Sequence, residues 1–267
     1  MSSVIELQSL HERVAVVSGG AGHIGIAVAE TLLELGAIVV LLDKDKTRAD
    51  SFLMKLPEEM SARISFKACD LTNAVEIESI SGEILSEFNS VSVLVNAAGL
   101  VGTSERSGWI TAFEKQELDP WNEALQVNLT SIFLLAKCFS SSLKAARGGT
   151  IVNIGSIYGA VGPDWRLYQG TSLGSPAGYA ASKGGVRALT NWLAATLAPE
   201  VRVNLISPGG IWRDQDETFV KRYIANTPLE RMGSEQDLKG AIAYFASDLS
   251  KYVTGQELFV DGGWTVR

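Results

Sequence analysis

Residues 14–43, VAVVSGGAGHIGIAVAETLLELGAIVVLLD, contain an apolar run, a glycine-rich turn, an amphipathic segment and a second apolar run. The β-branched residues at 14–17 predict a strand, and residues 37–42 predict a second strand after Gly36 ends the helix. Glycines at 19, 22 and 25 lie between the first strand and the helix. Glycines at such a turn let the backbone approach a pyrophosphate, and the helix amino terminus offers it free N–H groups. The stretch therefore predicts a dinucleotide-binding α/β unit.

An acidic residue follows the second predicted strand, at Asp43. A carboxylate at this place accepts hydrogen bonds from a ribose 2′-hydroxyl and repels a 2′-phosphate. The sequence thus favours NAD over NADP. Lys44, Lys46 and Arg48 lie close enough to weaken that preference, although they also suit the solvated start of a helix.

The alternation of strand and helix continues to the end of the chain. Apolar runs predict five further strands, at 64–68, 91–95, 150–154, 201–206 and 257–260. Helices are predicted between them, among others at 73–88 and 234–246. The expected fold is α/β: a single domain with a Rossmann-type, doubly wound parallel sheet of about seven strands flanked by helices.

Polar residues follow several of these strands, where parallel sheets bind their ligands. Asp70, Asn96 and Ser156 fall at such strand ends, although Asp70 suits a helix cap equally well. Asn128 lies inside a helix that we expect to begin at Asp119 and Pro120, with the acid as its cap. Asparagine is a poor interior helix former, so a buried polar role is expected for Asn128.

Tyr179 and Lys183 are four residues apart on a helix that Pro176 opens, so they lie on one face. A free phenol has a pKa of about 10, and an adjacent ammonium lowers it. Beside a nicotinamide cofactor, such a pair forms an acid–base centre. A core tyrosine and a surface lysine are the simpler interpretation of this motif in isolation.

Composition excludes several classes of function. The chain has 267 residues, 46% hydrophobic and 20% charged, with a net charge of −7 and a pI near 5.0. This acidity argues against a surface for nucleic acid or anionic membranes. Cys69 and Cys138 have no ligand spacing, so no metal site is expected. Residues 1–13 do not resemble a signal peptide and no apolar run spans a bilayer, so a soluble cytoplasmic protein is expected.

Together these residues resemble the single-domain branch of the short-chain dehydrogenase/reductase family over residues 12–264. The resemblance rests on the 18–25 turn, Asp70, the NAAG of 96–99, Asn128, Ser156, Tyr179 with Lys183, Pro208-Gly209 and the YVTGQ of 252–256. It implies reversible hydride transfer between the nicotinamide and a secondary alcohol or ketone. The catalytic residues that it implies are Asn128, Ser156, Tyr179 and Lys183.

The family assigns a role to each of these four side chains. Tyr179 would exchange the hydroxyl proton, and Lys183 would lower the tyrosine pKa and bind the nicotinamide ribose. Ser156 would hydrogen-bond the substrate oxygen, and Asn128 would hold a water that links Lys183 to solvent. The implied cofactor-binding residues are Gly19, Gly22, His23, Ile24, Gly25, Asp43, Asp70, Leu71, Asn96, Ala98, Gly99, Tyr179, Lys183, Pro208, Gly209 and Ile211.

The chain departs from the family pattern in places. His23 replaces the middle glycine of the turn, where it either leans over the pyrophosphate or is simply a tolerated first-turn helix residue. Ser18 and Ala97 replace a threonine and an asparagine, which are mild changes. Arg213 replaces a threonine that commonly lies near the nicotinamide amide, which leaves the cofactor contacts of 211–213 open.

Three segments are expected to surround the active-site mouth, at about 100–118, 157–176 and 211–230. Each contains a tryptophan near an arginine. Aromatic faces stack on sugar rings and arginine binds phosphate or carboxylate, so we expect an anionic carbohydrate-type substrate, a sugar phosphate or sugar nucleotide. A similarity to a subgroup found with bacterial surface-sugar and flagellin-glycan biosynthesis points the same way. The expected substrate contacts are Trp109, Trp165, Arg166, Trp212 and Arg213; loop packing or a subunit interface explains the tryptophans equally well.

Two alternatives remain open. The first is an enzyme of the same family acting on a 3-oxoacyl chain, a steroid or a simple polyol. The second is a catalytically silent, NAD-sensing regulator, although such proteins usually lose the tyrosine or the lysine. The resemblance also implies a homodimer or homotetramer through the helices that hold Asn128 and Tyr179, while core packing explains their apolar runs at 132–139 and 186–197 equally well.

Overall fold

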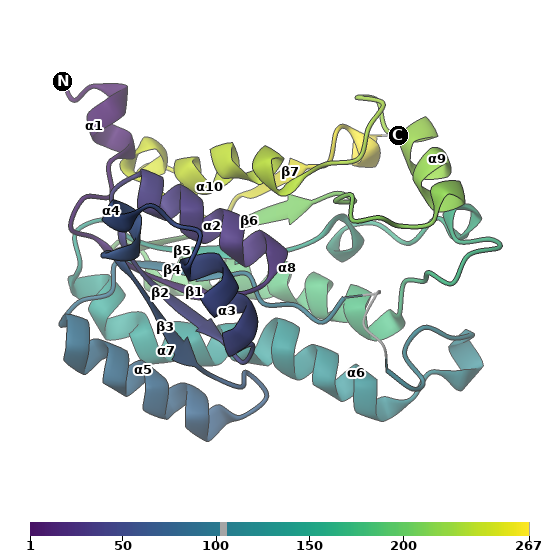
Figure 1. The fold of residues 1–267 in the computed structure, drawn as a ribbon, viewed down its shortest axis with the longest axis horizontal. Helices are drawn as coiled ribbons and strands as arrows, with labels where there is room; N and C mark the ends of the chain where they lie inside the picture. Colours follow the sequence, from purple (N-terminus) through teal and green to yellow (C-terminus); the bar gives the residue numbers. More distant parts are fainter. Residues whose placement is uncertain (102–105, 267) are drawn as a thin grey trace.

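The computed structural model describes residues 1–101 and 106–266, and in this part of the chain seven parallel strands form one sheet (Figure 1). Their order is β3-β2-β1-β4-β5-β6-β7, which reverses direction between β1 and β4. A reversal of this kind opens a crevice at the carboxyl ends of the two strands. The bounds are β1 (Val14–Ser18), β2 (Ile38–Asp43), β3 (Ile64–Ala68), β4 (Val93–Asn96), β5 (Gly149–Ile154), β6 (Val201–Pro208) and β7 (Glu257–Val260).

The predicted doubly wound α/β fold is confirmed, and the strands agree with the apolar runs to within about two residues. The central strands are buried at every position because helices cover both faces, which explains why they are continuous apolar runs. Ala15 and Val17 of β1 face the core beneath α2 (His23–Glu34) and α10 (Lys239–Ala246). Val14 and Val16 face the opposite core, beneath α5 (Ala74–Phe88), α7 (Ser131–Ala145) and α8 (Ala177–Leu197).

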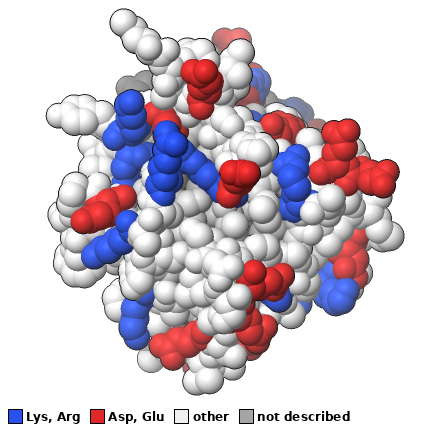
Figure 2. Space-filling model, turned by 90° about the vertical axis from the view of Figure 1, so that its left-hand side faces the viewer, with Lys and Arg blue, Asp and Glu red and all other residues white. Residues whose placement is uncertain are grey.

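Shorter elements complete the fold. The α-helices α1 (Val4–Gln8), α3 (Lys46–Leu53), α4 (Glu58–Ser61) and α9 (Glu217–Ala225) lie at the periphery in Figure 1. Single turns of 3₁₀-helix include η1 (Phe113–Lys115), η3 (Ile157–Gly159), η4 (Trp165–Leu167), η5 (Glu235–Leu238), η6 (Asp248–Ser250) and η7 (Trp264–Val266). On the face shown in Figure 2, acidic and basic side chains are interspersed with uncharged surface.

The structure decides two helix caps, the alternative cap role of Asp70 and the predicted cap role of Asp119. The cap of α5 is Asn73, whose Oδ1 accepts from the backbone N–H groups of Val75 and Glu76, so Asp70 is left for another role. The helix expected to begin at Asp119 and Pro120 begins at Leu118, where Glu117 makes no side-chain cap, so the prediction for Asp119 is wrong. Pro120 is tolerated in the first turn because the N–H groups of a first turn have no partner within the helix.

A continuous helical segment, Leu118–Ala145, joins α6 (Leu118–Leu125), a π-helical turn η2 (Gln126–Thr130) and α7. Its 28 residues are long and apolar enough to cross a membrane by length and composition alone, although polar and charged residues interrupt its apolar runs. Its apolar residues pack against α5, α8 and the sheet, which accounts for this composition. The π turn was not predicted; such turns often occur at functional sites, and this one contains Asn128.

Buried side chains form a row of hydrogen bonds across the sheet. The register places Ser18, Asn96 and Asn153 side by side on β1, β4 and β5. Asn96 Nδ2 donates to Asn153 Oδ1 at 2.8 Å, and Asn153 Nδ2 donates to Thr190 Oγ1 on α8 at 2.9 Å. Ser18 Oγ lies 3.5 Å from Asn96 Oδ1. The row therefore ties the helix α8 to the centre of the sheet.

The glycine turn gives a test of the fold. A Cβ at Gly25 would lie 2.0 Å from the backbone oxygen of Gly19, so we expect Gly25→Ala to lower the free energy of unfolding by at least about 1–3 kcal/mol. Gly82 is the matched control, because it is exposed within α5 and a Cβ there meets nothing within 4 Å. Gly82→Ala should raise stability by about 0.5–1 kcal/mol. Urea denaturation measures both; equal effects would contradict this account of the turn.

Candidate active site

A cleft of about 480 Å³ opens at the carboxyl ends of β1, β2 and β4, at the predicted crevice. The glycine turn forms one side, and Gly22 caps α2 without a side-chain hydrogen bond, so the first-turn N–H groups have no side-chain cap. A cleft of bare backbone beside an uncapped helix amino terminus suits a diphosphate. The predicted cofactor residues that line it are Gly19, Gly22, His23, Ile24, Gly25, Asp43, Asp70, Leu71, Ala98, Gly99, Tyr179 and Lys183.

Four predicted cofactor residues do not line this cleft. Asn96 is buried beneath it in the polar row, so its side chain supports the sheet. Pro208, Gly209 and Ile211 line a neighbouring cavity instead. The sequence does not distinguish these four residues from the residues that line the cleft, because a strand end carries both inward and outward side chains.

Two carboxylates shape the cleft. Asp43 Oδ2 accepts from the backbone N–H of Ala21 at 3.0 Å, and Oδ1 accepts from that of Asp45 at 3.0 Å, which holds the glycine turn to the end of β2. Asp70 Oδ1 accepts from the backbone N–H and the hydroxyl of Thr72, both at 2.9 Å. The backbone bond is the main cause that lowers the pKa of Asp70, so the Asp70 carboxylate is an acceptor at neutral pH.

Cations also gather along the cleft, where Lys44, Arg48, Arg106 and Arg213 all contribute to the lining. His23 is both the first residue of α2 and a lining residue, so both sequence interpretations of it apply. Burial lowers the pKa of His23, and the nearby Arg213 and Arg48 lower it further. The cleft is thus positively charged although the whole chain is acidic.

Lys183 lies at the base of the cleft with 4% of its surface exposed. Its Nζ donates to the backbone oxygen of Ile154 at 2.8 Å, and burial lowers the pKa of the ammonium to about 8. The same Nζ lies 5.9 Å from the ring centroid of Tyr179. The predicted placement of the two side chains on one face of a helix is therefore seen in α8.

The Tyr179 phenol lies beside the side chain of Ser156, and both residues line the same cavity. Burial raises the pKa of Tyr179, while the Ser156 hydroxyl and the charge of Arg213 act in the opposite direction. Ser156 Oγ also accepts from the backbone N–H of Tyr158 at 3.2 Å, which fixes the serine at the start of η3. The strand end and the helix thus bring a hydroxyl, a phenol and an ammonium together.

Asn128 is fully buried in the π turn. Its Oδ1 accepts from the backbone N–H of Leu100 at 2.7 Å. Its Nδ2 donates to the backbone oxygen of Leu100 at 3.0 Å and to Ser182 Oγ at 2.9 Å. The two side-chain donors are thus engaged in holding residue 100 to α8, so the side chain anchors this strand-end segment.

A second cavity of about 310 Å³ adjoins the cleft and shares Ile24, Val101, Gly155, Tyr179 and Arg213 with it. Ser156 also lines it. Four aromatic side chains that sequence reasoning missed complete its lining: Tyr158, Tyr168, Phe219 and Tyr223. The sequence could have indicated these four residues, because they lie in the segments at 157–176 and 211–230 that were expected to form the active-site mouth.

Of the five expected substrate contacts, the structure places only Arg213 on this cavity. Trp109 is 2% exposed, packs in a core with Tyr179, and donates through Nε1 to the backbone oxygen of Val101 at 2.9 Å. Trp165 and Trp212 are exposed outside the cavity, and Arg166 is paired with Asp164 at 2.7 Å. The structure therefore does not bring the three tryptophans to the lining of this cavity, and their contact with a substrate stays a prediction. The segment at 100–118 includes residues 102–105, which lie outside the described residues.

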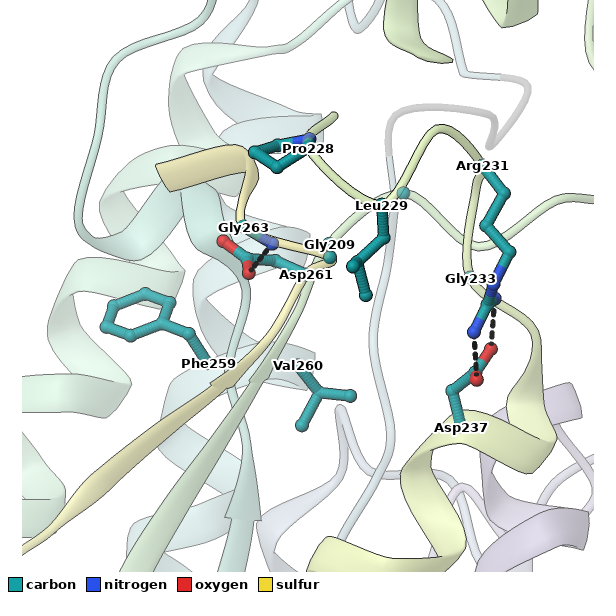
Figure 3. A pocket seen from close by; sticks show the side chains of 12 residues that line it. Gly209, Pro228, Leu229, Arg231, Gly233, Asp237, Phe259, Val260, Asp261 and Gly263 are labelled. Carbon is teal, nitrogen blue, oxygen red and sulfur yellow. Dashed lines mark hydrogen bonds and ion pairs between the residues drawn. The ribbon is translucent and has the colours of Figure 1, made fainter. Parts of the chain in front are cut away.

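A third cavity, of about 440 Å³, lies behind the second at the carboxyl ends of β6 and β7 (Figure 3). Gly209 and Gly210 line both. Arg231 and Asp237 lie together at one side of this hollow and make two hydrogen bonds of 2.8 and 2.6 Å, so the charges neutralise each other (Figure 3). None of the predicted catalytic residues reaches it.

Known proteins resemble the whole chain. The family model described as enoyl-(acyl carrier protein) reductase matches residues 19–265. A 3alpha-hydroxysteroid dehydrogenase of Mediterraneibacter gnavus is 32% identical, over 95% of this chain and 97% of its own length. The 3-oxoacyl-(acyl-carrier-protein) reductase FabG of Escherichia coli is 31% identical, over 94% and 96%.

Solved structures agree with this assignment. A short chain dehydrogenase of Leptospira borgpetersenii with bound NAD⁺ is 34% identical with a TM-score of 0.85, and the match covers 99% of this chain and 96% of that one. A gluconate 5-dehydrogenase of Burkholderia cenocepacia, in complex with NADP and tartrate, is 28% identical with a TM-score of 0.85, over 99% and 100%. The chain therefore belongs to the short-chain dehydrogenase/reductase family of oxidoreductases.

Proposed function

We propose that the protein transfers a hydride between NAD(H) and a secondary alcohol or ketone, with Tyr179 as general acid and base. The observation that carries this proposal is the position of the Tyr179 phenol. It lies where the cleft meets the second cavity, beside Ser156, and has the Lys183 ammonium 5.9 Å from its ring centroid. An acid–base group must lie within reach of both substrate and cofactor, and this place provides it.

The cleft fits a nicotinamide dinucleotide. The uncapped start of α2 and the backbone of Gly19 and Gly22 would hold the diphosphate, and Asp43 would accept from the adenosine ribose hydroxyls. Lys183 would contact the nicotinamide ribose. When bound, the nicotinamide supplies or accepts the hydride. We propose NAD as the preferred cofactor because Asp43 repels a 2′-phosphate, although Lys44 and Arg48 oppose that repulsion.

The chain's own residues move the proton. Tyr179 Oη takes the hydroxyl proton during alcohol oxidation and returns it during ketone reduction. Burial alone opposes a phenolate, so the positive charges of Lys183 and Arg213 have to stabilise it. Ser156 donates to the substrate oxygen as negative charge develops there. Asn128 positions α8 against residue 100, and a water held nearby would pass protons between Lys183 and solvent.

For the substrate we propose an anionic, carbohydrate-type molecule, a sugar phosphate or sugar nucleotide, and Arg213 is now its main support. The relatives named for steroid and 3-oxoacyl substrates support the alternative class equally well. A silent NAD-sensing role is disfavoured because all four catalytic side chains are present. A homodimer or homotetramer in the cytoplasm completes the proposal; Phe133 on α7 and Trp192 on α8 are exposed apolar side chains that a subunit contact would cover.

Replacing the phenol tests the proposed chemistry. We expect Tyr179→Phe to reduce turnover by about 10²–10⁴-fold, because the proton loses its acceptor while the cleft is unchanged. NADH absorbance with NAD and NADP, across sugar phosphates, sugar nucleotides, polyols and hydroxyacyl esters, measures this change. Cofactor affinity should stay within a few-fold, and Tyr252→Phe, at an exposed tyrosine, is the control. A Tyr179→Phe variant that retains most of the turnover would refute the assignment.

The buried ammonium predicts a pH-dependent stability. The pKa of Lys183 lies at about 8 instead of 10.5, so the folded chain holds this proton less tightly than the unfolded chain does. Burial of the ammonium therefore destabilises the folded chain by the full amount below pH 8. This destabilisation disappears as the pH rises toward 10.5. Without cofactor at pH 7, we expect Lys183→Met to raise the free energy of unfolding by about 1–3 kcal/mol. This figure allows for the loss of the hydrogen bond to Ile154, which offsets part of the gain. Urea denaturation at pH 7 and 9.5 should show this advantage shrinking; an advantage independent of pH would contradict it.

The cofactor preference depends on one charge. We expect Asp43→Asn to raise the ratio of kcat/KM for NADP over NAD by about tenfold, since the repulsion of a 2′-phosphate is lost while one acceptor oxygen remains. Asp50→Asn is the control, because Asp50 pairs with Lys46 outside the cleft. Steady-state kinetics with both cofactors measures the ratio. An unchanged ratio would mean that other residues select the cofactor.

A further inference from the structure

Five aromatic side chains form a closed circuit beside Tyr179. Tyr168 contacts Phe219 at a centroid distance of 5.4 Å, and Phe219 contacts Tyr223 at 5.9 Å. Tyr223 stacks on Trp264 at 5.9 Å, and Trp264 meets Tyr158 edge-on at 6.3 Å. The hydroxyls of Tyr158 and Tyr168 close the circuit at 2.5 Å. Four of the rings line the second cavity, and we call these four, Tyr158, Tyr168, Phe219 and Tyr223, the aromatic wall.

The aromatic wall is assembled from distant parts of the chain. Tyr158 and Tyr168 flank the segment after β5, Phe219 and Tyr223 belong to α9, and Trp264 supports them from η7. The α9 pair is almost fully buried and packs with Leu167 and Met232. Such packing fixes the ring orientations before a ligand arrives, so a rigid, flat-faced ligand binds with a small entropic cost.

The wall is uncharged and carries three phenol hydroxyls. In the Tyr158–Tyr168 pair one phenol donates to the other, so the proton of the accepting phenol is not used within the pair. The Tyr223 oxygen accepts from the backbone N–H of Gly210 at 2.6 Å. Burial raises the pKa of Tyr158, and it raises the pKa of Tyr168 to about 12, so both phenols stay neutral. A substrate therefore meets an uncharged aromatic surface that offers phenol hydroxyls.

Arg213 is the one charged residue among the described residues that line this cavity. Its Nε donates to Glu235 Oε1 at 3.0 Å, and its backbone N–H donates to Gln215 Oε1 at 2.7 Å, so both backbone and side chain are held. In the described part of the chain its terminal amino groups make no hydrogen bond. Among the described lining residues Arg213 is the single cation and there is no acid, and Glu235 pairs with its Nε only. The terminal amino groups can therefore pair with the carboxylate or phosphate oxygens of a ligand that has one anionic group.

We propose that the second cavity takes a compact, ring-shaped secondary alcohol that carries one anionic group. The ring lies against the aromatic wall, the anion pairs with Arg213, and the alcohol carbon lies beside Tyr179 and Ser156. A six-membered ring, pyranose or carbocycle, presents C–H faces that pack on aromatic rings. A volume of about 310 Å³ suits one substituted ring. This inference rests on the proposed function and names the substrate class for the same site.

Binding of unreactive analogues to the NAD-loaded protein tests the inference without turnover. Cyclohexanecarboxylate has the ring and the charge, its methyl ester has the ring alone, and hexanoate has the charge alone. Tetrahydropyran-2-carboxylate, which has no hydroxyl group, provides the pyran-ring counterpart. Isothermal titration should show cyclohexanecarboxylate or tetrahydropyran-2-carboxylate binding at least about tenfold more tightly than the ester and hexanoate. The tighter of the two identifies the ring type.

Variants separate the anion contact from other effects of Arg213. Arg213→Gln should weaken binding of the ring acid by about 10- to 100-fold and leave the ester within a few-fold. Arg213→Lys should retain part of the affinity, because the charge remains. Arg166→Gln is the matched control, an arginine paired with Asp164 outside the cavity. Because Arg213 also lines the cleft, NAD is kept saturating for each variant.

Tyr168→Phe tests whether the aromatic ring or its hydroxyl group gives the preference for ring acids. This variant keeps the ring and removes the hydroxyl, so it should still bind the ring acids more tightly than hexanoate. The inference is overturned if hexanoate binds as well as both ring acids, if neither ring acid binds, or if Arg213→Gln weakens the ester as much as the acid. A failure of the proposed function would appear differently, as turnover retained in Tyr179→Phe.

Discussion

A row of buried hydrogen bonds, from Ser18 through Asn96 and Asn153 to Thr190, holds the catalytic helix to the sheet. Buried amides without partners would each cost about 1–3 kcal/mol, so the row forms only when the strand register and the helix position agree. In that arrangement α8 places Lys183 beneath the end of β5 and Tyr179 beside Ser156. The geometry of the acid–base centre thus depends on polar contacts inside the core.

The candidate active site lowers the stability of the folded chain. Lys183 is held in a buried place where its charge is disfavoured, and Tyr179 is buried where a phenolate is disfavoured. Each would be destabilising alone, while together an ammonium and a phenolate support each other. The cavity beside Tyr179 has a different origin, because η3, the residue after η4 and α9 supply its aromatic wall from outside the sheet. The sheet that supports the site and the residues that line the second cavity therefore come from separate parts of the chain.

The sequence predicts the features that depend on local pattern. Apolar runs such as 14–17 and 150–154 are strands because buried parallel strands need no alternation, and the glycine turn follows from steric limits at Gly25. Features that depend on distant contacts were missed. Trp109 lies in a core instead of the mouth because Val101 and Tyr179 enclose it, and Arg166 is engaged by Asp164. The aromatic wall and the π turn at Asn128 likewise form only in the folded chain, because their partners are remote in sequence.

The central claim is that Tyr179 is the group that ionises beside the bound cofactor. Ultraviolet difference titration of the tyrosines, with the protein saturated by NAD, measures this ionisation directly. We expect one tyrosine to titrate well below the ordinary pKa of about 10, and this step to be absent from Tyr179→Phe. If no tyrosine of the NAD complex titrates below that value, or if the step persists in Tyr179→Phe, the acid–base centre lies elsewhere.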